Sequence, residues 1–131
     1  VYAIDINPEA IKYLERNTIV NGVWRNVIPL LGDAADIARS KLRGVADRVI
    51  MNLPEKAAEY LEAASDAVKP SGGIIHYYEF AEGPSFLNAI KERVTETMKK
   101  TRRKLERIPE ARIVREVAPF RWQIAVDLLI R

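Results

Sequence analysis

Two acids stand where the chain leaves short apolar runs, at positions that suit contacts to a nucleoside. Asp5 follows the run 1–4, and Asp33 follows the run 27–31 and Gly32. A carboxylate at such a place can accept two hydrogen bonds from ribose hydroxyls, and another can accept one from an adenine amino group. Each acid can also be interpreted as purely structural, Asp5 as a turn or capping residue and Asp33 as a helix N-cap. Either acid alone is therefore a weak indication.

Further polar and aromatic residues follow the third and fourth apolar runs. Asn52, Leu53 and Pro54 come directly after the run 45–51, and residues 77–80 end the fourth run. Ligands of open α/β sheets bind beyond the carboxyl ends of the strands, where the loops converge. We therefore expect these residues to share one rim with the two acids.

Hydrophobic periodicity predicts alternating strands and helices that would create this rim. The strand 45–51 is a continuous apolar stretch of the kind covered on both faces. Pro29 cannot donate to a ladder, so its strand should lie at or near a sheet edge. The expected strands are 1–4, 27–31, 45–51 and 73–80, and the expected helices are 8–20, 36–42, 55–68 and one from Pro84 to Met98.

The end of the chain alternates with a period of two over residues 122–130. A second β-like stretch, 113–118, precedes it, and residues 119–121 form a tight connection. This pattern predicts an antiparallel hairpin that finishes a sheet otherwise built from strand–helix–strand crossovers. The fold class is therefore α/β, with helices on both faces of the sheet, in a single domain over residues 1–131.

Composition excludes several kinds of protein and site. The 131 residues, 48% apolar and 30% charged, are typical of one globular domain. The chain has no cysteine and one histidine, which excludes disulfides, thiolate chemistry and a multi-histidine metal centre, so no metal is expected. No apolar run approaches the length that a membrane-spanning helix needs, and the first residues lack the pattern of a secretory signal. We therefore expect a cytoplasmic protein.

Basic residues gather after the last predicted helix, within a net charge of +3. The candidates for RNA contact are Lys99, Lys100, Arg102 and Arg103. They fit phosphate neutralisation, and they equally fit solvated cations at a helix C-terminus. No aromatic residue interleaves with them, which argues against base stacking there. His76 lies within a predicted strand and is interpreted as a packed residue rather than a general base.

The order and spacing of four segments resemble the class I S-adenosylmethionine-dependent methyltransferases, whose fold is Rossmann-like. More narrowly, the chain is similar to the catalytic domain of the archaeal and eukaryotic tRNA (guanine-N1)-methyltransferases, which modify the guanosine 3′ to the anticodon, at position 37. The resemblance covers nearly the whole chain. The segments are VYAIDINPEAIKYLERN, LLGDA, ADRVIMNLPEKAAEYLEAA and VKPSGGIIHYYEF.

The narrower likeness rests on Asn52, Leu53 and Pro54 and on residues 75–80. Base-amino methyltransferases usually carry Asn/Asp-Pro-Pro-aromatic after this strand. Here Leu53 replaces the first proline and Glu55 the aromatic residue, which suits a ring-nitrogen acceptor better than an exocyclic amine.

The resemblance implies a role for each matching position. Asp5 would hold the ribose of S-adenosylmethionine with Ile6 packed near its adenosine, and Asp33 and Ala34 would contact the adenine. Asn52 would sit between cofactor and target base, since an amide can meet both donor and acceptor edges of one flat base. The implied catalytic residues are Asn52 and Pro54, the latter as a wall of the guanine pocket.

The chain also departs from the family. Such a domain begins with a strand and a Gly-x-Gly loop that approaches the cofactor, and neither is found here. We therefore expect a partial catalytic domain that starts at the family's second strand. Its tRNA-recognition regions and general base would lie upstream of residue 1. The sheet should show a gap between the first and third strands, to be filled by missing residues, by a second chain or by direct pairing.

Two alternatives to a tRNA methyltransferase remain open. One is transfer of the aminocarboxypropyl group of the same cofactor to tRNA in the wybutosine pathway. The other is a non-catalytic RNA-binding module that keeps the fold. Asn52, Leu53 and Pro54 favour methyl transfer, and tRNA is the expected partner of the enzyme. Because its cofactor site would be incomplete, this chain alone should bind S-adenosylmethionine poorly and be inactive.

Overall fold

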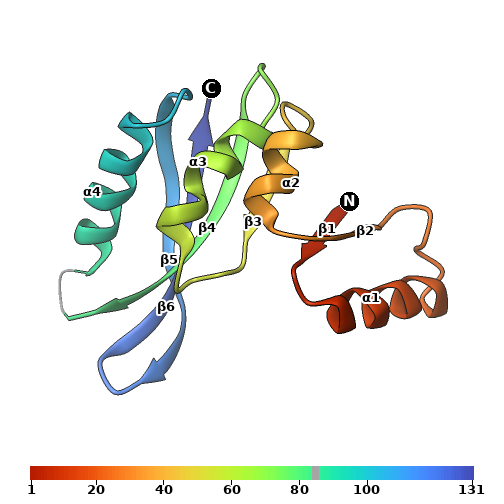
Figure 1. The fold of residues 1–131 in the computed structure, drawn as a ribbon. Coiled ribbons are helices and arrows are strands. Elements are labelled where there is room, and N and C mark those ends of the chain that lie inside the picture. Colours follow the sequence, from red (N-terminus) through yellow and green to blue (C-terminus); the bar gives the residue numbers. More distant parts are fainter. Residues whose placement is uncertain (84–85) are drawn as a thin grey trace.

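The computed structural model describes residues 1–83 and 86–131 and confirms the predicted alternation of strands and helices (Figure 1). The predicted helix start at Pro84 lies outside the described residues. The elements in chain order are β1 (Tyr2–Asp5), α1 (Pro8–Val20), β2 (Ile28–Leu31), α2 (Ala34–Ser40), β3 (Arg48–Met51), α3 (Ala57–Ala67), β4 (Gly73–Glu82), α4 (Phe86–Lys99), β5 (Leu105–Ala118) and β6 (Arg121–Ile130).

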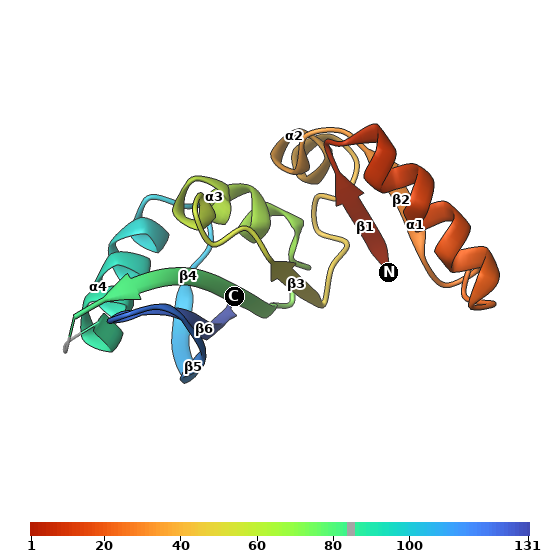
Figure 2. The same ribbon diagram turned by 90° about the horizontal axis from the view of Figure 1, so that it is seen from below.

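The strands form two sheets. β1 and β2 pair in parallel, while the second sheet has the order β3-β4-β6-β5. β3 and β4 are parallel, and the pairs β4–β6 and β5–β6 are antiparallel, which confirms the C-terminal hairpin. Pro29 lies in β2, which pairs only with β1 among the described strands, as expected for an edge. The expected gap is present too, since no described strand joins β1 to β3 (Figure 2).

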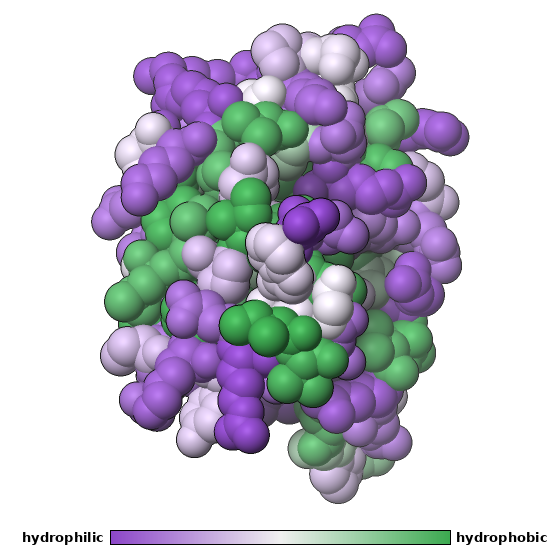
Figure 3. Space-filling model, turned by 90° about the vertical axis from the view of Figure 1, so that its right-hand side faces the viewer, coloured by the Kyte–Doolittle hydropathy of each residue, from purple (hydrophilic) through white to green (hydrophobic). Residues whose placement is uncertain are grey.

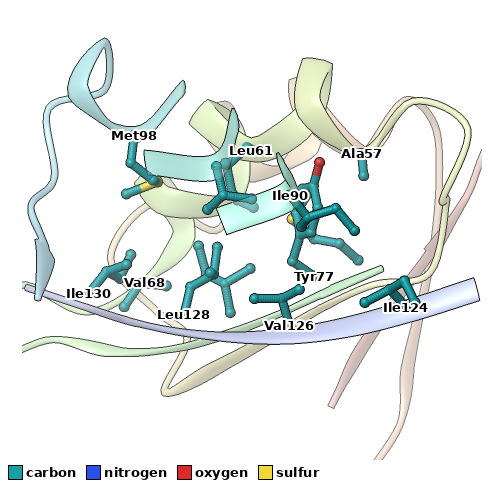
Figure 4. Packing of buried hydrophobic residues seen from close by; sticks show 14 of the residues in the cluster. Ala57, Leu61, Val68, Tyr77, Ile90, Met98, Ile124, Val126, Leu128 and Ile130 are labelled. Carbon is teal, nitrogen blue, oxygen red and sulfur yellow. The ribbon is translucent and has the colours of Figure 1, made fainter. Parts of the chain in front are cut away.

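The main core lies between the four-stranded sheet and the helices α3 and α4. Ile90, Val94 and Met98 recur every four residues along α4 and are all buried. They meet Val126 and Leu128 of β6 and the other inward-facing residues of the sheet (Figure 4). The period of four on the helix and two on the strand is what turns these side chains toward one another.

The opposite face of this sheet is open at β3, which corrects the expectation that β3 is covered on both sides. Ile50 is 70% exposed, whereas its neighbour Met51 is buried toward α3. α1 packs on β1 and β2 and does not reach this face among the described residues. An apolar strand favours burial of both its faces. Burial of the second face also requires another helix or strand to pack on it, and the strand sequence does not determine whether one does.

The hairpin is longer than its sequence pattern indicates. β5 begins at Leu105, eight residues before the expected start at Ile113. Pro109 and several charges break the alternation there, and the structure absorbs them as irregularities in register between Arg107 and Glu110. The turn contains Phe120 with a φ of 61°, an unusual value for an aromatic residue.

The side of the molecule formed by β1, β2 and α1 mixes apolar and hydrophilic side chains (Figure 3). A shallow apolar groove of about 450 Å³ between α1 and β2 is lined by Ile19, Trp24 and Pro29, among others.

Within residues 1–83 and 86–131, no helix is long and apolar enough to cross a membrane.

Candidate functional site

Asp5 ends β1 beside the end of β2. Its backbone oxygen accepts a hydrogen bond from the amide of Gly32 at 3.0 Å, which keeps the two strand ends level. Its Oδ1 accepts from the amide of Asn7 at 2.8 Å, and the Asn7 side chain caps α1 through the amide of Glu9. Asp5 is thus a turn residue. Because it is also exposed, its second oxygen can serve a ligand.

Ile6 follows Asp5 and is 69% exposed despite its apolar side chain. A large apolar residue held in water gains free energy when a ligand covers it. This position next to the candidate ribose contact fits the packing against adenosine that the resemblance implies.

Asp33 caps α2 and also bonds to α3. Its Oδ1 accepts hydrogen bonds from the amides of Ala35 at 2.8 Å and Asp36 at 3.1 Å, and its Oδ2 accepts from the hydroxyl of Tyr60 at 2.9 Å. The amide of Asp36 and then the Tyr60 hydroxyl hold the pKa of Asp33 below its usual value. Asp33 is therefore a firmly ionised acceptor, and Ala34 beside it is exposed in the first turn of α2.

Tyr60 is the residue that sequence reasoning missed. It belongs to α3 and packs against the main core, so its position in the sequence indicates only a core-facing helix residue. The hydrogen bond to Asp33, and then the negative charge of that carboxylate, raise the pKa of Tyr60, which keeps its hydroxyl protonated and able to donate. The pairing across 27 residues has no local sequence signal.

Asn52 and the two residues after it form the connection from β3 to α3. The backbone oxygen of Leu53 accepts from the amide of Lys56 at 3.2 Å, so the segment is a turn. Asn52 is exposed, and its side chain makes no hydrogen bond to the described part of the chain. Leu53 is 47% exposed, while Pro54 is half-buried. The amide group of Asn52 is therefore available for a ligand.

The structure brings Asp5, Asp33 and Asn52 to one edge, here called the carboxyl rim, the carboxyl ends of β1 to β4. Asp5 and Asp33 adjoin through the strand pair β1–β2. The bond from Tyr60 to Asp33 ties the end of β2 to the first turn of α3, just after the Asn52 segment. The expectation of a shared rim agrees with this geometry, whereas the role of each residue stays a prediction.

His76 lies away from this rim, on the open face of the four-stranded sheet. Arg48 lies with its Nη1 3.2 Å from Nε2 of His76, and Nδ1 of His76 is 2.8 Å from Oδ1 of Asp127. A guanidinium can only donate, so Nε2 accepts and Nδ1 donates to Asp127. The ring bridges two strands, which agrees with a structural interpretation.

Tyr77 and Tyr78 point to opposite faces, as the strand pattern predicts. Tyr77 is fully buried, and its hydroxyl donates to Oε2 of Glu79 at 3.1 Å. Burial raises the pKa of Tyr77 far above its usual value. The hydroxyl is therefore a neutral donor inside the core.

The basic residues lie at the other end of the sheet. Lys99 pairs with Glu96, and Arg103 donates to the backbone oxygen of Lys69, which precedes β4. The ten residues of β4 separate this end from the carboxyl rim by about 30 Å. Lys99 and Arg103 thus have partners within the chain. The RNA contacts expected of the four basic residues stay a prediction, and they would fall far from Asn52.

Comparison with known proteins identifies the family. A model of the TRM5/TYW2 methyltransferase domain matches residues 1–109. The chain belongs to this family. The resemblance read from the motifs is confirmed, and so is the Rossmann-like methyltransferase fold.

Individual relatives show what share of a longer protein this chain spans. The tRNA (guanine(37)-N(1))-methyltransferase Trm5b of Pyrococcus abyssi is 42% identical over 130 residues, 99% of this chain and 37% of the relative. The tRNA(Phe) (4-demethylwyosine(37)-C(7)) aminocarboxypropyltransferase of Methanocaldococcus jannaschii is 36% identical over 97% of this chain and 49% of its own length. The chain therefore spans about a third to a half of these relatives.

A solved structure of the TRM5/TYW2 family supports the described fold. The M. jannaschii TYW2 structure, in complex with AdoMet, superposes with a TM-score of 0.88 at 35% identity. It covers 100% of this chain, which covers 57% of the solved chain. The described elements are therefore arranged as the corresponding segment is in a solved relative.

Proposed function

We propose that residues 1–131 form part of the catalytic domain of an S-adenosylmethionine-dependent tRNA methyltransferase that acts on N1 of guanosine 37. The observation that supports this most directly is the placement of Asp5, Asp33 and Asn52 on the carboxyl rim. The P. abyssi relative carries this activity in its name, at 42% identity. A cytoplasmic location and tRNA as partner are parts of the same proposal.

The residues at the rim fit S-adenosylmethionine. Asp5 offers a carboxylate oxygen to the ribose hydroxyls, and Ile6 offers an exposed apolar surface to the adenosine. Asp33, held ionised by its neighbours, would accept from the adenine amino group, with Ala34 beside it. Two carboxylates also suit the positive charge of the sulfonium.

When bound, the cofactor would supply a methyl group on a sulfonium: the bond from the ring nitrogen to the methyl carbon would form as the carbon–sulfur bond breaks and a neutral thioether leaves. The residues of this chain would act by orientation. Asn52 would pair with the edge of the guanine and Pro54 would wall its plane, so that N1 faces the methyl group in line. Removal of the N1 proton needs a base, and we assign none among these residues.

We further propose that another strand completes the cofactor site, from the same protein or from a second chain. β1 and β3 each leave one edge without a partner among the described strands. Unpaired backbone groups at two facing edges favour insertion of a strand between them. The isolated chain should then bind the cofactor weakly.

The aminocarboxypropyl transfer of the M. jannaschii relative is a second candidate, supported by 36% identity over nearly the whole chain. It would use the same cofactor, at a different carbon. The Asn52, Leu53 and Pro54 segment favours the methyl transfer. A non-catalytic RNA-binding module is the third candidate, and it predicts no cofactor binding at all.

One experiment separates the three. The whole protein that carries this chain is titrated with S-adenosylmethionine by calorimetry and then incubated with unmodified tRNA, and the nucleosides are analysed by mass. N1-methylguanosine supports the proposal, and an aminocarboxypropyl product supports the second candidate. Absence of cofactor binding supports the third. Tight binding by residues 1–131 alone would contradict the incomplete site.

A further inference from the structure

A second recess lies on the carboxyl rim, away from the candidate cofactor residues. It has a volume of about 300 Å³ and opens between the end of β4, the first turns of α4 and the start of β6. Two aromatic residues, Phe80 and Phe86, and two arginines, Arg93 and Arg121, line it. None of them is used by the proposed methyl transfer.

The aromatic rings of this recess are held in place by neighbours. The guanidinium carbon of Arg121 lies 4.8 Å from the centre of the Phe80 ring, within the range of a cation–π contact. Phe86 stacks on Trp122 with ring centres 5.1 Å apart and an angle of 27°. Rings fixed in this way lose little further freedom when a ligand packs on them.

The arginines are available to an anion. Arg121 lies with its Nε 3.5 Å from Oε1 of Glu82, and its side chain is 45% exposed. An exposed ion pair at this distance contributes little stability. Arg121 can therefore leave Glu82 and bind a phosphate at a small cost in free energy. Arg93 also lines this recess. Its Nε lies 3.1 Å from Oε1 of Glu79, and its side chain is 49% exposed.

The recess lies next to the target-base position. The last residue of β3, Met51, pairs with Tyr77 of β4, so Asn52 leaves the sheet one strand away from Tyr78. Phe80 is three residues beyond Tyr77, or about 10 Å along β4. A nucleotide adjoining a guanine held at Asn52 can therefore reach it.

We propose that this recess binds the nucleotide next to the target guanosine in single-stranded RNA, with its base on the Phe86 ring and its phosphate at Arg121. The proposal rests on the function proposed above and deepens it. Stacking on aromatic residues combined with arginine is how proteins hold single strands without reading their sequence. A nucleotide bound in this recess would then help to hold the target guanine out of the base stack, at Asn52.

Arg131 offers a matched control at the other end of β6. It also lies 3.5 Å from a glutamate, Glu106, across the hairpin. The variants R121Q and R131Q each remove one positive charge beside one carboxylate. The probe is an anticodon stem-loop RNA with guanosine at the target position, and its affinity for the whole protein is measured over a series of salt concentrations.

We expect R121Q to weaken RNA binding about fivefold and to lower the salt slope by roughly 0.7, the value for one phosphate contact on a single strand. R131Q should change neither. Equal effects of both variants, or a larger effect of R131Q, would overturn the proposal.

A second measurement tests stacking separately from charge. An abasic site is placed on either side of the target guanosine, and F86L removes one aromatic face while keeping an apolar side chain. Wild type should lose roughly tenfold in affinity for one of the two abasic RNAs. F86L should bind that RNA and the intact RNA alike. Indifference of wild type to both abasic sites refutes the recess as a base site.

These readouts do not depend on methyl transfer. If the protein binds no S-adenosylmethionine, the proposed function fails, whereas the comparison of R121Q with R131Q still decides the RNA contact. If the cofactor binds and methylation occurs but R121Q behaves as R131Q, only the recess proposal fails.

Discussion

The hydroxyl of Tyr60 donates to Oδ2 of Asp33 at 2.9 Å and so joins α3 to the end of β2. Asp33 simultaneously caps α2 through its other oxygen. One carboxylate thus sets the positions of two helices at the carboxyl rim. The adenine contact proposed for Asp33 depends on this orientation, which makes Tyr60 a positioning residue for the cofactor.

The variant Y60F tests that role. The ring keeps its packing, while Asp33 loses the bond that orients Oδ2. We expect the affinity of the whole protein for S-adenosylmethionine to fall several-fold, and the affinity for RNA to stay unchanged. Calorimetry with adenosine and with methionine separates the two halves of the ligand. A loss seen with methionine but not with adenosine would contradict the assignment.

Acid sensitivity provides a second test of Asp33. Its pKa is lowered in the folded chain, so its ionised form stabilises the fold above its usual pKa of 3.8, and that contribution is lost as pH falls through the lower, folded value. The variant D33N keeps an acceptor for the helix cap and cannot ionise. Urea unfolding from pH 7 to pH 3 should show the advantage of wild type shrinking below about pH 4. A constant difference would exclude the ionised cap.

Asn52 is expected to act on the base rather than on protein stability. The variant N52A should lower the rate of methylation about a hundredfold, the usual cost of losing correct orientation. The free energy of unfolding should not change, because the side chain is exposed. The neighbouring variant L53A is the control, and single-turnover rates with bound tRNA are the measurement. Equal rates for the two variants would remove Asn52 from the mechanism.

The two faces of the four-stranded sheet should respond differently to truncation. Ile90 lies on the side of α4 that packs on the sheet and is 0% exposed, so I90A should cost about 2–5 kcal/mol of unfolding free energy. Ile50 lies on the open face, and I50A should change the stability of residues 1–131 by less than about 0.5 kcal/mol. Urea titrations of both variants provide the comparison. A large cost for I50A in this chain would mean that the open face is buried in solution.

The sequence alone determined the order of elements and the rim. Crossover connections place the residues after β1, β2 and β3 at the same end of a parallel arrangement, so Asp5, Asp33 and Asn52 could be grouped without coordinates. The hairpin followed from the period of two over residues 122–130. Local patterns suffice for these features because chain direction and side-chain period are set by neighbouring residues.

Only the tertiary structure decided the contacts between distant segments. The bond from Tyr60 to Asp33, the early start of β5 and the open face around Ile50 depend on which elements pack together, and no local period encodes that. The basic residues near Lys99 are at the far end because α4 runs back along the sheet. The packing of α4 on the sheet determines where its C-terminal end lies. The position of these positive charges relative to the carboxyl rim therefore depends on tertiary structure and not on their order in the sequence.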